Sequence, residues 1–163
     1  MESDTSSCED SPKYNIALVS EFFFPRLGGV EMHIYHLARR LQDRGHKVIV
    51  ITNTHGNRQG IRYLSSGVKV YYAPIHGYFI QACIPTLFFR LPLIRCIFLR
   101  EKIQILHGHQ ATSMMHYEIS VIAKTMGLKT VFTDHSLFNF SDPENIFLHK
   151  CSKTLLSELD AAI

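Results

Sequence analysis

The sequence has few cysteines, and they are not spaced as metal ligands or as a redox pair. Cys8, Cys83, Cys96 and Cys151 are scattered along the 163 residues, and none of them forms a C-x-x-C motif. A cysteine-based zinc site is therefore not indicated. Reduced thiols in a cytosolic setting are the expected state.

Several motifs of nucleotide-binding and catalytic sites are also missing. The sequence contains neither G-x-G-x-x-G nor a P-loop, and no acidic residue follows the apolar run 48–51, which argues against a dinucleotide-binding domain. Asp134-His135-Ser136 contains the three residue types of a hydrolase triad. Adjacent residues point in different directions, however, and no G-x-S-x-G elbow is present. A serine hydrolase is therefore not favoured.

The charge pattern excludes two further classes. The net charge is +3 without any block of Lys or Arg, so nucleic-acid binding is not expected. Residues 70–89 contain no charged side chain, but Pro74, Gly77 and Pro85 argue against a membrane-spanning helix.

Residues 1–13 are polar and acidic, are not a secretory signal, and predict a disordered tail. Residues 14–163 are long enough for one domain with its own core.

Apolar runs of strand length alternate with segments of helical periodicity. This alternation predicts an α/β fold with a Rossmann-like parallel sheet flanked by helices. We expect strands at 16–20, 48–51, 67–73, 103–106 and 130–133, with another beginning at 160–163. Helices are expected at 29–44, 86–100, 112–126 and 143–157.

The segment 86–100 is apolar with arginines interspersed. Leu87, Leu91, Ile94 and Phe98 fall on one helical face, and the arginines lie mostly off it. Such a helix covers a sheet in most proteins. A basic amphipathic helix can also lie on an anionic membrane surface, and both interpretations stay open here.

A glycine pair follows the first expected strand and precedes the first expected helix. Gly28 and Gly29 are able to adopt positive φ and to let a ligand approach the backbone closely. The helix N-terminus that follows offers free N–H groups and the positive end of the helix dipole, which suits a phosphate or carboxylate. Glu31, in the first turn, also suits this dipole.

Polar side chains follow other strands, and ligands of parallel sheets bind at the carboxyl ends of strands. His107 and His109 flank Gly108 in an expected turn, where they would hydrogen-bond backbone, donate to a phosphate or sugar, or carry a proton. A metal site would need a third ligand such as Asp134 or His135, but no ligand spacing supports one.

The polar loop 53–60 follows the second expected strand and brings arginines to the same edge of the sheet. Arg58 and the nearby Arg62 are suitable phosphate clamps. Solvated loop arginines are the commoner case.

Longer stretches resemble a known family. Ser20-Glu-Phe-Phe-Phe-Pro25 with Gly28-Gly-Val-Glu-x-His33 resembles the opening of family 4 retaining glycosyltransferases. Other stretches are similar to the subfamily that starts the synthesis of glycosylphosphatidylinositol (GPI) anchors. They are Arg44-Gly-His-Lys-Val48, Gly56-Asn-Arg-x-Gly-Ile-Arg-Tyr-Leu64, Leu106-His-x-His109, Ala123-Lys-Thr-Met-Gly-Leu128 and Thr130-Val-Phe-Thr-Asp-His-Ser-Leu-Phe138.

This resemblance implies the N-terminal half of a GT-B enzyme with two Rossmann-like domains and a cleft between them. The N-terminal domain would receive phosphatidylinositol, and the other domain would hold the donor UDP-N-acetylglucosamine. Transfer would retain anomeric configuration without a metal or other cofactor. The resemblance further implies a transferase complex of several subunits at the cytoplasmic face of the endoplasmic reticulum membrane.

The resemblance also implies roles for individual residues. His109 matches the family's active-site histidine, and His135 is the second candidate catalytic residue. The Gly28-Gly29 turn would approach the donor diphosphate or the acceptor phosphate. From their charge, Arg58 and Arg62 would contact the acceptor head group. The full set of expected substrate-binding residues is Gly28, Gly29, Glu31, Arg58, Arg62, His107, Asp134 and Ser136.

The 163 residues depart from the family pattern in one large respect. They do not include the second domain with its paired glutamates, or the C-terminal transmembrane segment, and they stop inside an expected strand. We expect either a fragment or a truncated product. The alternative function is a non-catalytic form that binds complex partners or anionic lipid without turnover.

Overall fold

A computed structural model describes residues 11–74, 78–79, 82–83, 87–110, 113–135, 153, 157 and 159–163. The sheet is built from strands β1 (Asn15–Val19), β2 (Lys47–Asn53), β3 (Gly60–Tyr63), β4 (Lys69–Ala73), β7 (Ile105–His109), β8 (Lys129–Thr133) and β9 (Ala161–Ala162). A separate hairpin pairs β5 (Tyr78–Phe79) with β6 (Ala82–Cys83). The helices are α1 (Gly29–Asp43), α2 (Leu87–Glu101) and α3 (Met114–Thr125).

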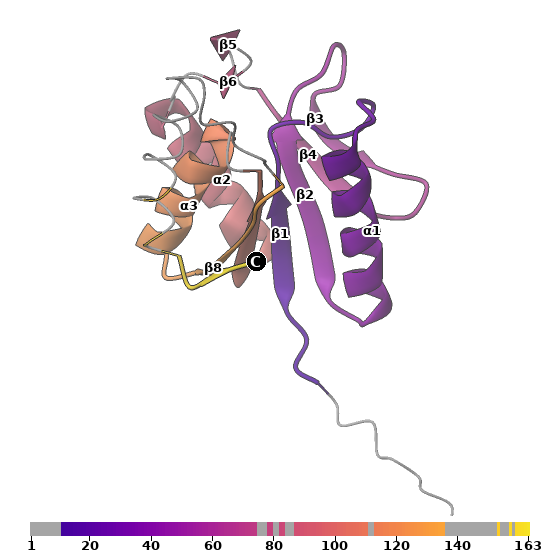
Figure 1. Ribbon diagram of the computed structural model, residues 1–163, viewed down its shortest axis with the longest axis vertical. Helices are drawn as coiled ribbons and strands as arrows, with labels where there is room; N and C mark the ends of the chain where they lie inside the picture. The colour runs from indigo at the N-terminus through magenta and orange to yellow at the C-terminus, as the bar shows by residue number, and fades with distance from the viewer. Residues whose placement is uncertain are drawn as a thin grey trace, which may run out of the picture.

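The seven strands of the main sheet run in the order β3-β4-β2-β1-β7-β8-β9. All neighbouring pairs are parallel except β3 with β4. Helix α1 covers one face of the sheet, and α2 and α3 cover the other (Figure 1). The α/β, Rossmann-like fold class predicted from the sequence is confirmed, and so is the strand that begins near residue 160.

The side-chain alternation of the strands divides the core into two layers. Val48 and Val50 of β2 pack with Ile34 and Ala38 of α1. The intervening Ile49 and Ile51 belong to the cluster that contains Ile94 of α2 and Ile119 of α3. A strand buried on both faces reads as a continuous apolar run, which explains why β2 was recognisable in the sequence.

Strand β3 was not predicted, because its residues carry no burial signal. All four of its residues are exposed, and the strand pairs only with β4, in antiparallel register from Gly60↔Tyr72 to Tyr63↔Lys69. The loop predicted at 53–60 therefore ends before Gly60, where β3 begins, and Arg62 lies in this strand. Exposed edge strands lack the hydrophobic alternation on which strand prediction rests.

Helix α2 forms where predicted, but its buried face differs from the expected one. Ile94, Ile97 and Phe98 are buried, whereas Leu91 is exposed. Within the described ranges, no helix has both the length and the apolar character needed to cross a membrane. The tail at 1–10, most of the helix expected at 143–157 and part of the 70–89 stretch lie outside the described residues.

A buried carboxylate anchors the last residue of α2 to the amino ends of two strands. Glu101 is 3% exposed, and its carboxylate lies 2.8 Å from Lys47 Nζ and 2.5 Å from Lys69 Nζ. The Tyr71 hydroxyl donates to the same carboxylate. Burial alone would raise the pKa of Glu101, but the hydrogen bonds from Lys47, Lys69 and Tyr71 outweigh it and lower the pKa to about 2.

We expect Glu101→Gln to lower the free energy of unfolding by about 2–3 kcal/mol at pH 7, somewhat less than the loss of a fully buried pair because Lys47 is partly solvated. Since the folded-state pKa is depressed, the charged Glu101 stabilises the fold above its ordinary pKa of 4.5 and loses this effect as the pH falls towards 2. Urea unfolding of both proteins should therefore show a difference that shrinks between pH 5 and pH 3.

Asp43→Asn is the matched control for Glu101→Gln, because Asp43 is an exposed carboxylate at the end of α1. It should change the free energy of unfolding by less than about 0.5 kcal/mol. Equal effects of the two substitutions would show that the buried network does not anchor α2.

Candidate functional site

The candidate site lies at the carboxyl edge of the parallel strands, beside β1. The chain leaves β1, passes through Gly28 and enters α1, which leads to β2 on one side of β1. On the other side of β1 lies β7, which is reached only after α2. Strand order therefore reverses around β1, and such a switch point opens the crevice in which ligands of α/β sheets bind.

His107, Gly108 and His109 lie inside β7, so the prediction that they form a turn after the strand is wrong. Gly108 pairs with Val19 of β1 and with Phe132 of β8, and His109 pairs with Thr133. The chain turns one residue later, at Gln110, which has a φ of 73°. Because side chains alternate along a strand, His107 and His109 share the face of the sheet on which α1 lies.

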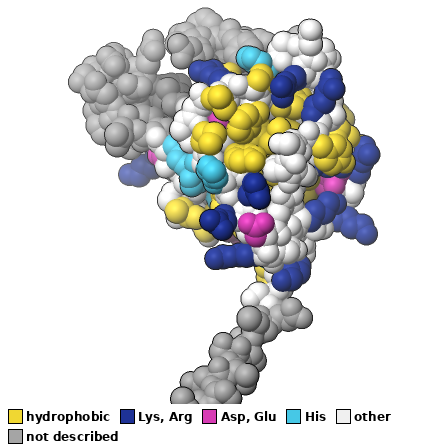
Figure 2. Space-filling model, turned by 90° about the vertical axis from the view of Figure 1, so that its right-hand side faces the viewer, with side chains coloured by type: hydrophobic (Ala, Val, Ile, Leu, Met, Phe, Trp, Pro, Cys, Tyr) yellow, Lys and Arg dark blue, Asp and Glu magenta, His cyan; other side chains and the backbone are white. Residues whose placement is uncertain are grey.

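Three histidines from three segments meet on that face. His109 Nδ1 lies 3.2 Å from His135 Nε2, and the two rings are stacked with centroids 5.5 Å apart. The ring of His33, in the second turn of α1, lies 4.7 Å from that of His135 and 5.7 Å from that of His109. Histidine side chains gather at the surface on the α1 side of the molecule (Figure 2). We call His33, His109 and His135 the histidine cluster.

The histidine cluster extends inward through His107. Its ring stacks on that of His109 at 4.3 Å, and its Nε2 lies 2.8 Å from the Thr133 hydroxyl. The sequence predicted His109, His135 and His107 as site residues, and the fold brings them together. His33 was not predicted, although it belongs to the motif that carries the family resemblance. The helical spacing of α1 placed His33 off the apolar face, but it gave no reason to expect a partner.

Burial keeps the imidazoles of His107, His109 and His135 neutral. Burial, with a smaller contribution from the neighbouring histidines, lowers the pKa of His109 to about 2 and that of His107 to about 4. Burial and His33 also lower the pKa of His135, against an opposing effect of Asp134. His107, His109 and His135 therefore offer uncharged donors and acceptors at neutral pH.

The opposite face of β7 explains the glycine between the two histidines. A Cβ atom on Gly108 would lie 1.7 Å from His116 Nδ1 of α3. His116 is fully buried, stacks on Phe132 and lies 3.2 Å from the Ser120 hydroxyl. Glycine at position 108 is thus required for the close approach of a side chain.

The Gly28-Gly29 turn does not adopt the positive φ that the sequence suggested, and its contact with a phosphate stays a prediction. Gly28 is extended, with φ −149° and ψ 176°, and Gly29 is not among the residues with positive φ, so neither glycine uses its left-handed freedom. A Cβ on Gly28 would instead lie 2.4 Å from Glu31 Oε2. The buried Glu31 carboxylate thus lies at the start of α1, the position expected for a bound anion, and its Oε1 lies 4.0 Å from Arg26 Nε.

The remaining predicted site residues lie farther away or beyond the described ranges. Arg58 and Arg62 line a shallow hollow with Asn57, Tyr63 and Leu64 at the β3 edge. Three strands separate β3 from β7, a distance of about 19 Å across the sheet. Asp134 is exposed beside His135, and Ser136 is outside the described residues.

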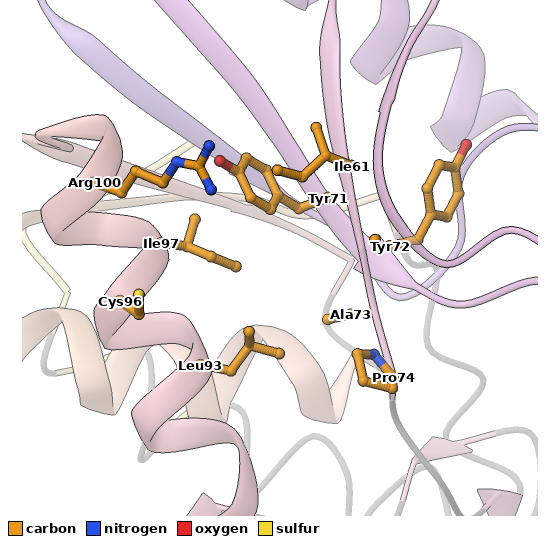
Figure 3. Close-up of a pocket in the computed structure, with 10 residues that line it drawn as sticks. Ile61, Tyr71, Tyr72, Ala73, Pro74, Leu93, Cys96, Ile97 and Arg100 are labelled. Atoms are coloured by element: carbon orange, nitrogen blue, oxygen red, sulfur yellow. The ribbon is translucent and has the colours of Figure 1, made fainter.

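An apolar hollow lies between α2 and the β3–β4 hairpin (Figure 3). It has a volume of about 210 Å³, with Ile61, Leu93 and Ile97 among its lining residues and Arg100 at one end. It lies on the sheet face opposite the histidine cluster and belongs to a different surface.

A family model described as PIGA (GPI anchor biosynthesis) matches residues 53–142, more than half of the chain. The chain belongs to this family. The human PIGA relative, named as a subunit of phosphatidylinositol N-acetylglucosaminyltransferase, is 53% identical over 84% of the chain and 28% of the human protein. The Arabidopsis thaliana protein of the same name is 47% identical over 94% of the chain and 34% of that protein. The chain spans about a third of the length of these PIGA relatives.

Solved structures confirm the fold. Sucrose-phosphate synthase from Thermosynechococcus elongatus matches 92% of the chain and 42% of its own chain, with a TM-score of 0.60 and 17% identity. A glycosyltransferase from Rickettsia africae matches 93% of the chain and 37% of its own, with a TM-score of 0.61 and 19% identity. The chain therefore shares the Rossmann-like α/β fold of part of each of these proteins.

Proposed function

We propose that this chain is the N-terminal, acceptor-side half of an enzyme that transfers N-acetylglucosamine from UDP-N-acetylglucosamine to phosphatidylinositol, the first step of GPI-anchor synthesis. The observation that carries the proposal is the histidine cluster at the switch point of the sheet, in a chain of the PIGA family. The names of the relatives support the sugar and the acceptor.

The chemistry of the cluster fits sugar transfer. A neutral imidazole both donates and accepts a hydrogen bond, so it can orient a hydroxyl of the donor sugar or of the inositol ring. His109 is suited to this because its position is fixed by β7 and its Nε2 is buried without a hydrogen-bond partner among the described residues. His135, less enclosed, would complete the contact. The donor diphosphate would be held mainly by the second domain, with the N-terminus of α1 beside it.

The surface of α2 supports contact with a membrane at the cytoplasmic face of the endoplasmic reticulum. Leu91, Leu93 and Leu99 are exposed on α2 together with Arg95 and Arg100, and no acidic residue lies among them. Apolar side chains flanked by arginines suit the interface of an anionic bilayer. The apolar hollow beside α2 extends this surface.

Further proteins of the transferase complex are the remaining expected partners, since the relatives are themselves named as subunits.

A second candidate function is a non-catalytic module that binds partner proteins of the complex or anionic lipid. It is favoured by one observation, the exposed leucines and arginines of α2, which suit an anionic lipid surface. Vesicle co-sedimentation of the 163-residue chain, with phosphatidylinositol-rich and neutral vesicles at low salt, tests its lipid arm. Binding to neither vesicle would contradict both the lipid-binding module and the membrane-facing role of α2.

We expect His109→Ala in the full-length enzyme to reduce transfer to phosphatidylinositol by about 100-fold or more, because a positioned acid–base or hydrogen-bonding group contributes at least that much. The measurement is the rate of N-acetylglucosamine transfer from labelled donor, with circular dichroism to confirm folding. His36→Ala is the matched control, since His36 is an exposed histidine of α1 outside the cluster. Near-normal turnover of a folded His109→Ala enzyme would refute the role of this residue.

A further inference from the structure

We propose that the histidine cluster also binds a divalent transition-metal ion of the zinc type. His33, His109 and His135 each offer one ring nitrogen, and these three atoms lie within 4.8 Å of one another. The spacing follows from the fold, which brings α1, the end of β7 and the segment after β8 together, and no sequence motif contains it. The inference goes beyond the proposed function, which requires no metal.

The distances fit imidazole coordination. Zinc binds histidine nitrogen at about 2.0–2.1 Å in tetrahedral geometry, which places two ligand nitrogens about 3.3 Å apart. His109 Nδ1 and His135 Nε2 are 3.2 Å apart. The third nitrogen has to move by roughly 1.5 Å at most to reach the same spacing. His33 is exposed, so a rotation of its side chain supplies this movement without disturbing the core.

One ring nitrogen of His109 has no hydrogen-bond partner among the described residues. Its Nδ1 meets His135, but its Nε2 is buried and has no partner among the described residues. If Nδ1 donates, Nε2 is a buried acceptor without a donor, and if Nδ1 accepts, Nε2 is a buried donor without an acceptor. A metal bound at Nδ1 would keep the proton on Nε2, so this buried atom is unsatisfied with or without the ion. Coordination of a metal by both rings replaces that hydrogen bond with two stronger contacts.

The arrangement of the three ligands is typical of open metal sites. Three imidazoles leave a fourth position for water or another ligand, as in zinc sites with three protein ligands. His109 belongs to a strand and His33 to a helix, so two of the ligands are held by regular structure.

Titration with Co²⁺ tests the site. The full-length protein, without a histidine tag and stripped with a chelator, should develop the ligand-field absorption of four-coordinate Co²⁺, and excess Zn²⁺ should abolish it. His33→Ala and His135→Ala should each weaken binding at least tenfold. His36→Ala should leave binding unchanged, because this exposed histidine is not part of the cluster.

Two results would overturn the metal site. One is the absence of Co²⁺ bands in the wild-type protein, and the other is unchanged affinity in His33→Ala. Since His33 is exposed, its replacement should leave the fold intact, and circular dichroism checks this. If the wild-type protein binds no Co²⁺ but His109→Ala still abolishes transfer, the metal site is refuted and the proposed function is not.

Discussion

Acidification from pH 7 to pH 5 should lower the free energy of unfolding of the metal-free protein by about 3–6 kcal/mol. The buried His109 and His116 and the half-buried His107 cause this loss. Burial and neighbouring histidines lower the pKa of His107 to about 4, of His109 to about 2 and of His116 to about 3. In the unfolded chain these side chains return to an ordinary pKa of 6.5.

The sign follows from where the protons bind. Below pH 6.5 the unfolded chain takes up a proton on each of these histidines, whereas the folded protein stays neutral there until the pH is much lower. Acid therefore favours unfolding, by about 1.4 kcal/mol per pH unit for each group. The lower part of the expected range allows for His107, which is only half-buried.

Urea unfolding between pH 7 and pH 5, in the presence of EDTA, measures this effect. His107→Asn should flatten the dependence by close to one proton, while His36→Asn, at an exposed position of α1, should leave it unchanged. The Glu101 network contributes only at lower pH, since its carboxylate titrates below 4.5. A stability that is constant from pH 7 to pH 5 would show that these imidazoles are not neutral and buried.

The sequence predicted the sheet well where strands are buried on both faces. The run at β2 is apolar throughout because Val48 and Val50 pack on α1 while Ile49 and Ile51 pack on the opposite layer. Strand β3 was missed because it is an exposed edge, paired on one side only. Its formation moves Arg62 out of the expected loop and leaves the arginines about 19 Å from β7. Their contact with the acceptor head group stays a prediction.

The site was predictable in outline but not in its contacts. Parallel strands bring their carboxyl ends to one edge, so His109 and His135 were expected to lie close together. The addition of His33 depends on how α1 packs across the sheet, which periodicity does not specify. The surroundings of the glycines were not predictable for a similar reason. Gly108 is needed because the buried His116 ring approaches it closely, and Gly28 lies against the end of the Glu31 side chain; no local turn signal reveals either approach.

Gly108→Ala should lower the free energy of unfolding by about 3 kcal/mol or more, at the upper end of the cost of overpacking a core. The added methyl would lie 1.7 Å from His116 Nδ1 and 2.1 Å from its Cε1. The His116 ring has no room to retreat, since it is fully buried and stacks on Phe132 with centroids 4.8 Å apart. The backbone of β7 is equally constrained, because it pairs with β1 on one side and β8 on the other.

Thermal unfolding measures this effect, and the expected fall in Tm is about 6–12 °C. Gly29→Ala is the matched control, because nothing lies within 4 Å of the added methyl at the first residue of α1, and helix propensity favours alanine by up to about 1 kcal/mol. Combining Gly108→Ala with His116→Ala should cost less than the sum of the two single changes, since the methyl then enters the space left by the ring. Wild-type stability of Gly108→Ala would mean that His116 does not pack against β7, and additive costs would mean that the two positions do not touch.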